Sequence, residues 1–346
     1  MPLPDLPEQY EYIETIGSGT YGVVILARDV TVRDPEKAKV AIKLMAAPGK
    51  VQVEAMSREL LIHGAVRHPH IVPVRRCFST AHHIGVVMDY VGGGRLFDML
   101  NKEGPFPEAK ARWIFRQLMD AVRYIHQDMN SMHRDIKLEN IILADSKKQW
   151  PSIYLCDFGF ARTRGPQFGP TVSCVGSPNY FAPEILLRNA KYQRYDGKKA
   201  DIYSCGAVLF IMLYGFYPKG VLKRSSGFGL DLGNIAIELP RFQRQRLPPQ
   251  PSSRVGGLKF PCTPRSSASS KAPGTPGSTA SSRVPTTPRT KDVPIGQDCL
   301  HLLEQMLAPD PDKRISLQGI WKDRWFQSKV SRRRRSMSVI SKAFKF

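Results

Sequence analysis

The sequence predicts an α+β fold in which a small strand-rich N-terminal part precedes a larger, mainly helical C-terminal part. Over about the first ninety residues, apolar and polar side chains alternate with the period of a strand. From about Pro107 onward, apolar side chains recur at helical spacing. A run of strands followed by a run of helices is typical of the α+β class. The 346 residues, 42% of them hydrophobic, can bury a sizeable core in one large domain or two smaller ones.

The N-terminal part is expected to hold strands with one helix among them. Strands are predicted on both sides of the glycines in 12–30, again over 39–45, and over 83–91, where the apolar run indicates a buried strand. The segment 53–66 has the pattern of a helix. Three consecutive glycines at 92–94 then mark a boundary.

The C-terminal part is expected to be built from helices. In 107–127, Ile114, Leu118, Val122 and Ile125 form one apolar stripe. The segment 200–215 is apolar nearly all round, and its length favours a buried helix over a strand. Ordered structure is expected again over 297–326.

Two basic segments interrupt and end this pattern. Between Lys219 and Asp292 there are 13 Lys or Arg and 3 Asp or Glu, and the last twenty residues contain 7 basic residues and no acid. They carry most of the net charge of +21, so the rest of the chain is nearly neutral. Because Ser, Pro, Gly and Thr dominate 221–294, we expect a disordered insertion there. This location of the charge argues against a nucleic-acid-binding protein.

The glycines Gly17, Gly19 and Gly22 suggest that backbone approaches phosphate closely. The G-x-G-x-x-G pattern also opens dinucleotide-binding folds, but those need a helix next, and here a strand pattern continues. No G-K-[ST] follows, which excludes a Walker-type loop. Two interpretations remain, a phosphate-binding hairpin and a simple glycine turn.

Lys43 lies in the middle of a predicted strand, and Glu59 begins an apolar helical stretch. An ion pair between them would hold an ammonium over nucleotide phosphates. The alternative for Lys43 is a solvated charge at a sheet edge.

The sequence HRDIKLENIIL at 133–143 places several polar groups before an apolar run. Asp135 can accept a proton from a hydroxyl, Lys137 can neutralise a phosphoryl group in transfer, and Asn140 can offer a carbonyl oxygen to a hard cation. Asp157 follows a second apolar strand, where it can hold magnesium. This set of groups is what phosphoryl transfer requires.

The ordered set of GSGTYG at 17–22, VAIK at 40–43, Glu59, HRDIKLEN at 133–140, DFG at 157–159 and APE at 182–184 resembles the eukaryotic protein kinase family. The resemblance covers nearly all of 10–220 and 297–327. It implies a bilobal protein-kinase fold, with an N-lobe and hinge at 10–91, after an extension at 1–9, and a C-lobe at 92–328. The insertion at about 221–294 interrupts the C-lobe, and a basic tail occupies 329–346.

The resemblance also implies roles for individual residues. ATP would bind between the lobes with Mg²⁺, or Mn²⁺ as an alternative. Asp135 would be the base, Lys137 and Lys43 would bind phosphates, Glu59 would orient Lys43, and Asn140 and Asp157 would hold the metal. The nucleotide would also contact Ile16, Gly17, Ser18, Gly19, Gly22, Val24, Ala41, Met88, Asp89, Tyr90 and Val91. Ser177 would help to place the acceptor hydroxyl, Asp201 would anchor the catalytic loop, and Glu184 would pair with Arg314.

In finer detail the chain resembles the calcium/calmodulin-dependent and AMP-activated kinase group, and within it the plant sucrose-nonfermenting-related stress-activated kinases. The motifs that carry this resemblance include RELLIHGAVRHPHIV at 58–72 and VSCVGSPNYFAPEIL at 172–186. The family usually has GGEL where this chain has GGRL, with Arg95 in place of the acid. The resemblance therefore sets no substrate consensus.

Regulation is expected at two places. Arg134 resembles the family arginine that binds a phosphate on the activation loop, so we expect an upstream kinase to modify Ser173, or else Thr171. The tail SRRRRSMSVISKAFKF fits several roles: nuclear import, attraction to anionic surfaces, a phosphosite or pseudosubstrate, binding to calmodulin or an acidic partner, and a tail without function.

The expected function is phosphorylation of Ser or Thr in protein substrates, in intracellular stress or energy signalling. A catalytically weak scaffold that recruits partners through its basic segments is the alternative. We expect a cytoplasmic protein that can also be nuclear, because the N-terminus has no signal-peptide pattern and no apolar run is long enough for a membrane span.

Overall fold

The computed structural model describes residues 5–19, 22–46, 66–157, 162–163, 177–186, 195–218 and 295–328. All of them belong to one compact unit, formed by residues 1–248 and 295–346. The expected helix at 53–66 lies outside the described residues except for Val66, as do the basic insertion and the basic tail.

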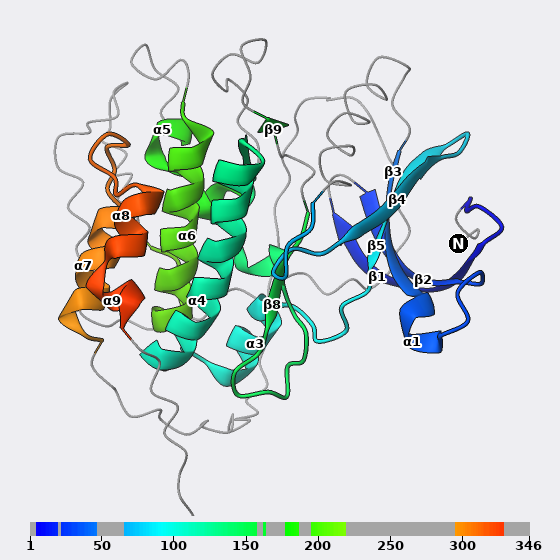
Figure 1. Cartoon of the computed structure of the whole chain (residues 1–346), viewed down its shortest axis with the longest axis horizontal. Coiled ribbons are helices and arrows are strands. Elements are labelled where there is room, and N and C mark those ends of the chain that lie inside the picture. Colours follow the sequence, from blue (N-terminus) through cyan, green and yellow to red (C-terminus); the bar gives the residue numbers. More distant parts are fainter. Residues whose placement is uncertain are drawn as a thin grey trace, which may run out of the picture. The chain divides into compact units, whose positions relative to one another are not determined.

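The N-terminal part is an antiparallel sheet of five strands, drawn in blue and cyan in Figure 1. Along the sheet the order is β1 (Tyr10–Gly19), β2 (Gly22–Asp29), β3 (Lys39–Ala46), β5 (His83–Asp89) and β4 (Val74–Ser79). Alternate residues of the strands pack on two faces. Val40, Ile42 and Leu44 of β3 belong to one apolar cluster, whereas Met45 packs with Val86 and Met88 in the other.

Glycine is required where β2 begins. Gly19 pairs with Gly22 in the register of the two strands. Gly22 has φ = 138°, and a Cβ atom there would collide with the backbone carbonyl of Leu44 on the neighbouring β3. Any other residue would therefore be strained at this position. The glycine-rich segment is thus a hairpin, as the sequence predicts.

A short helix, α1 (Pro35–Ala38), connects β2 to β3. Asp34 caps it by accepting hydrogen bonds from the backbone N–H groups of Glu36, at 3.0 Å, and Lys37, at 3.4 Å. These bonds to the backbone lower the pKa of the Asp34 carboxyl group.

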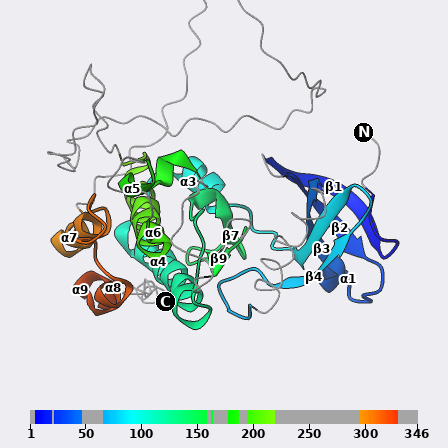
Figure 2. The same cartoon turned by 90° about the horizontal axis from the view of Figure 1, so that it is seen from above.

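The C-terminal part consists mainly of helices around one large apolar core. Its helices are α3 (Leu96–Glu103), α4 (Glu108–Arg123), α5 (Pro183–Leu186), α6 (Gly197–Tyr214), α7 (Gln297–Met306), α8 (Leu317–Lys322) and α9 (Arg324–Gln327). Figures 1 and 2 both show α4 beside α6. Every residue of α6 from Cys205 to Leu213 is buried, which explains why this segment is apolar all round.

Two small sheets carry the loops that matter for function. One pairs β6 (Ser131–Met132) with β9 (Arg162–Thr163), and the other pairs β7 (Ile141–Leu143) with β8 (Ile153–Leu155). The stretch between β6 and β7 contains Asp135, and β8 leads into Asp157. The 3₁₀ turn at Leu138–Asn140 connects the stretch that contains Asp135 to β7.

This arrangement confirms the predicted α+β class and its bilobal division into a small strand-rich part and a larger helical part. Backbone hydrogen bonds join the parts, because Leu155 of β8 accepts from Val72 N at 3.0 Å and donates to His70 O at 2.8 Å. No helix in the described ranges is both long and apolar enough to cross a membrane.

Candidate active site

The carboxylate of Asp135 lies at the centre of a buried cluster of polar groups. The Ser177 hydroxyl donates to Oδ1 of Asp135 at 3.0 Å, and Nζ of Lys137 lies 2.8 Å from Oδ2. The side-chain amide of Asn140 donates to Oδ2 at 3.0 Å and to the backbone carbonyl of Asp135 at 2.8 Å. Lys137 Nζ also donates to Ser177 Oγ at 2.8 Å. Three predicted site residues therefore meet at the carboxylate of a fourth.

Asp201 of α6 holds the loop that carries Asp135. Its carboxylate accepts the backbone N–H groups of His133 and Arg134, each at 2.8 Å, and it lies 2.8 Å from Nε2 of His126. These contacts fix Arg134 in the left-handed region, with φ = 67°, where a residue with a side chain needs support from its surroundings. Burial alone would raise the pKa of Asp201, but the hydrogen bonds that its carboxylate accepts from His126 and from the backbone N–H of His133 lower it overall.

His133 has a structural role that the sequence reasoning missed. Its ring is fully buried; Nδ1 accepts the backbone N–H of Asp135 at 3.3 Å, and Nε2 donates to the carbonyl of Cys156 at 3.2 Å. Burial lowers the pKa of His133, so the ring is neutral at neutral pH, in agreement with one donating and one accepting nitrogen. His133 thereby links the Asp135 loop to the residue before Asp157. The signal in the sequence that could have indicated this role is that His133 lies two residues before Asp135.

Lys43 lies on β3 and forms an ion pair with the Oδ1 atom of Asp157. Both side chains are partly shielded from water, so Lys43 is not a solvated edge charge. Asp157 has φ = 64°, a left-handed conformation that is unusual for a residue with a side chain and is often found at functional sites. Glu59, the partner expected for Lys43, lies outside the described residues.

Asn140 and Asp157 offer the oxygen atoms expected of a magnesium site. Asn140 uses its NH₂ group to bind Asp135, which leaves its amide carbonyl oxygen as the atom available for a cation. Across the described residues, no group of three or more His, Cys, Asp or Glu side chains could hold a metal by itself. Magnesium commonly binds one or two protein oxygens and completes its shell with water and phosphate. The donor set therefore fits a cation shared with a nucleotide.

The residues predicted to contact the nucleotide lie on neighbouring strands or directly after β5. Ala41 of β3 is opposite Met88 of β5, and Val24 of β2 is opposite Lys43. Met88 is buried, and Val91 and Cys156 pack against its cluster. Asp89 ends β5, and Tyr90 and Val91 follow it outside any helix or strand. Ile16, Gly17, Ser18 and Gly19 belong to β1 and Gly22 begins β2.

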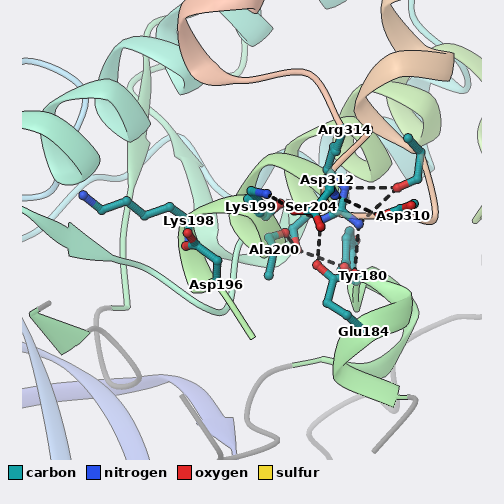
Figure 3. A network of polar contacts seen from close by, with 11 residues as sticks. Tyr180, Glu184, Asp196, Lys198, Lys199, Ala200, Ser204, Asp310, Asp312 and Arg314 are labelled. Atoms are coloured by element: carbon teal, nitrogen blue, oxygen red, sulfur yellow. Dashed lines mark hydrogen bonds and ion pairs between the residues drawn. The ribbon is translucent and has the colours of Figure 1, made fainter. Parts of the chain in front are cut away.

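A second buried ion pair joins α5 to the segment between α7 and α8. Arg314 donates from Nη1 to Oε1 of Glu184 at 2.7 Å and from Nη2 to Oε2 at 2.9 Å, as Figure 3 shows. The same guanidinium donates to the carbonyls of Lys199 and Ala308 and lies 5.1 Å from the centre of the Tyr203 ring. The pair predicted from the resemblance is therefore present, and it fixes α5 against α6 on the helical side.

Tyr180 is another residue that the sequence reasoning missed. Its hydroxyl donates to Glu139 at 3.1 Å and accepts the backbone N–H of Leu138 at 3.4 Å. Its backbone carbonyl accepts from Ser204 Oγ at 2.9 Å, a contact drawn in Figure 3. Burial raises the pKa of Tyr180, so the phenol stays protonated and connects the segment after Ser177 to the Asp135 loop.

The predicted phosphorylation sites Thr171 and Ser173 lie outside the described residues. Arg134, which was expected to bind their phosphate, is described, and its backbone position is set by Asp201. Regulation through these residues stays a prediction.

Comparison with known proteins gives one consistent result. The model of the protein kinase domain matches residues 10–326. The serine/threonine-protein kinase SRK2I of Arabidopsis thaliana is 32% identical over 326 residues, covering 94% of this chain and 74% of that protein. The serine/threonine-protein kinase SAPK3 of Oryza sativa subsp. indica is 33% identical over 93% of this chain and 78% of its own. SRK2A of the moss Physcomitrium patens is 32% identical over 92% and 74%. These relatives confirm the resemblance to plant sucrose-nonfermenting-related kinases.

Proposed function

The chain belongs to the protein kinase family, and from that premise we propose that it transfers the γ-phosphoryl group of ATP to serine and threonine hydroxyls of protein substrates. The observation that carries this proposal is the convergence of Lys137, Ser177 and Asn140 on the carboxylate of Asp135. Membership of the family implies the use of ATP and a divalent metal ion.

Asp135 is proposed as the base that accepts the proton of the substrate hydroxyl. Hydrogen bonds and an ion pair hold both oxygens of its carboxylate in place. The Ser177 hydroxyl donates to Oδ1 at 3.0 Å, which is the contact that the hydroxyl of a substrate would make with the base. Lys137 lies next to this position, where its ammonium can neutralise the charge of the phosphoryl group as it moves. Positioning and charge neutralisation, rather than covalent chemistry, account for most catalysis of this class.

Lys43 is proposed to bind the α- and β-phosphates of ATP, and Asn140 and Asp157 to hold Mg²⁺, with Mn²⁺ as an alternative. When bound, the ion would neutralise negative charge on the phosphates during transfer. The ion pair between Lys43 and Asp157 supports this assignment, because it brings the phosphate-binding and metal-binding groups to the same place.

The alternative of a catalytically weak scaffold is not favoured. Such a protein would lack Lys43, Asp135 or Asp157, and all three are present. Control by an upstream kinase, a partner bound to the basic tail, and a cytoplasmic or nuclear location stay proposals. Removing residues 329–346 and following both location and activity would test the last two.

Transfer of ³²P from γ-labelled ATP to a protein acceptor, followed by phosphoamino-acid analysis, tests the proposal. The native chain should label serine or threonine, and Asp135→Asn should reduce the rate by about 10²-fold or more. Asp298→Asn, the same change at an exposed position of α7, serves as the matched control and should keep the native rate. Equal rates for Asp135→Asn and native protein would refute the role of Asp135, and label on tyrosine alone would refute the substrate class.

A further inference from the structure

The side chain of Arg95 lies against the glycine-rich hairpin. Arg95 directly precedes α3, where its backbone pairs with Ile142 of β7 and accepts the N–H of Met99 at 3.2 Å. A Cβ atom built on Gly17 would lie 3.1 Å from Nη2 of Arg95. The next nearest atom to that Cβ is in the side chain of Val24, at 3.7 Å. The guanidinium therefore occupies the space that the first glycine of the hairpin leaves open.

Arg95 differs from the two lysines of the candidate site in its partners. Lys43 is paired with Asp157, and Lys137 with Asp135. No carboxylate in the part of the chain that the structure describes forms an ion pair with Arg95, and its side chain is exposed.

We propose that Arg95 is an additional nucleotide-binding residue, which donates hydrogen bonds from its guanidinium to the phosphate chain of ATP. The inference rests on the proposed function, because it assumes that ATP lies beneath the hairpin. A guanidinium has five N–H donors in a planar fork and keeps its charge at all relevant pH values, so it suits phosphate oxygens. An unpaired cation next to a bound polyanion gains a charge-assisted contact without first breaking another ion pair.

This assignment gives Gly17 a specific role. The first glycine leaves the hairpin without a side chain at the point where the guanidinium approaches, and 3.1 Å is closer than a Cβ atom normally comes to a nitrogen. A methyl group at position 17 would collide with the guanidinium. The hairpin, Arg95 at the start of α3, and Lys43 of β3 would thus each contact the bound nucleotide.

Titration of the full-length chain with ATP, ADP, AMP and adenosine, each in the presence of Mg²⁺, tests the proposal. The Arg95→Met variant removes the charge and keeps much of the length of the side chain. Its affinity for ATP and ADP should fall about tenfold, and its affinity for adenosine by less than about twofold. Arg95→Lys should keep part of the ATP affinity, because it retains a point charge. Lys102→Met, on the last turn of the same helix, is the matched control and should bind like the native chain.

The pattern of losses decides the outcome. An equal loss for ATP and adenosine would show a contact with the sugar or base and would overturn the phosphate assignment. Unchanged or tighter ATP binding by Arg95→Met would overturn it as well. A native chain that binds MgATP but transfers no phosphoryl group would refute the proposed function and leave this inference intact. A native chain that does not bind ATP would refute both.

Discussion

Replacing Arg314 with methionine should destabilise the helical part strongly. The Arg314 and Glu184 side chains are 0% and 1% exposed, so the remaining carboxylate would stay buried without a countercharge. The guanidinium makes five hydrogen bonds, two to Glu184, two to the carbonyl of Ala308 and one to that of Lys199. Breaking a buried pair by removing one partner costs about 3–5 kcal/mol, and we expect a loss of this size.

Urea unfolding followed by tryptophan fluorescence and far-ultraviolet circular dichroism measures this loss. The double variant Glu184→Gln with Arg314→Met should recover part of it, because the uncompensated charge is then absent. Lys199→Met, which removes an exposed ion pair with Asp312, is the control and should change stability by less than about 1 kcal/mol. A loss below about 1 kcal/mol for Arg314→Met, or a double variant no more stable than the single one, would refute the reasoning.

Three further outcomes are expected. Burial lowers the pKa of His133 below its usual 6.5, so the unfolded chain binds a proton at this ring at a higher pH than the native chain does, and the native chain loses stability as pH falls through 6.5. The difference in unfolding free energy between native protein and His133→Gln should therefore shrink from pH 7.5 to pH 5.5, and a constant difference would contradict this. Burial raises the pKa of the Cys156 thiol to about 12, so iodoacetamide should modify it very slowly at pH 7.5, and rapid labelling by peptide mapping would contradict the assignment. Gly22→Ala should weaken ATP binding measured by calorimetry, because alanine is strained at φ = 138° and would displace the hairpin from Leu44; native affinity would show that the hairpin adapts.

Much of the fold is predictable because its elements have a local period. The apolar run in 83–91 corresponds to β5 at His83–Asp89, and the apolar segment 200–215, which is ambiguous by pattern alone, is α6 at Gly197–Tyr214. One deviation is the end of α4, where the chain continues as a wider helical turn over Tyr124–Asp128. The hydrophobic stripe continues through Ile125, so its spacing does not reveal this change.

The candidate site is predictable in its residue types but not in all of its contacts. The order of Asp135, Lys137 and Asn140 along one short loop is enough to indicate their chemistry, because each side chain supplies a different group that phosphoryl transfer needs. The contact of His126 with Asp201 joins residues 75 positions apart, and Arg116 donates at 2.7 Å to the carbonyl of Phe326, 210 positions away. Such contacts depend on how helices pack, and no local spacing in the sequence records them.

Lys43, Asn140 and Asp157 are proposed to position ATP and its metal ion. Calorimetric titration of the purified chain with ATP, once with saturating Mg²⁺ and once with a chelator, is the most direct test of this positioning. Convergence of Lys43, Asn140 and Asp157 on one metal-bound triphosphate predicts a single site whose affinity falls about tenfold or more without the metal, and Asp157→Asn should remove most of this dependence. Equal affinity with and without Mg²⁺, or no binding under either condition, would contradict the account.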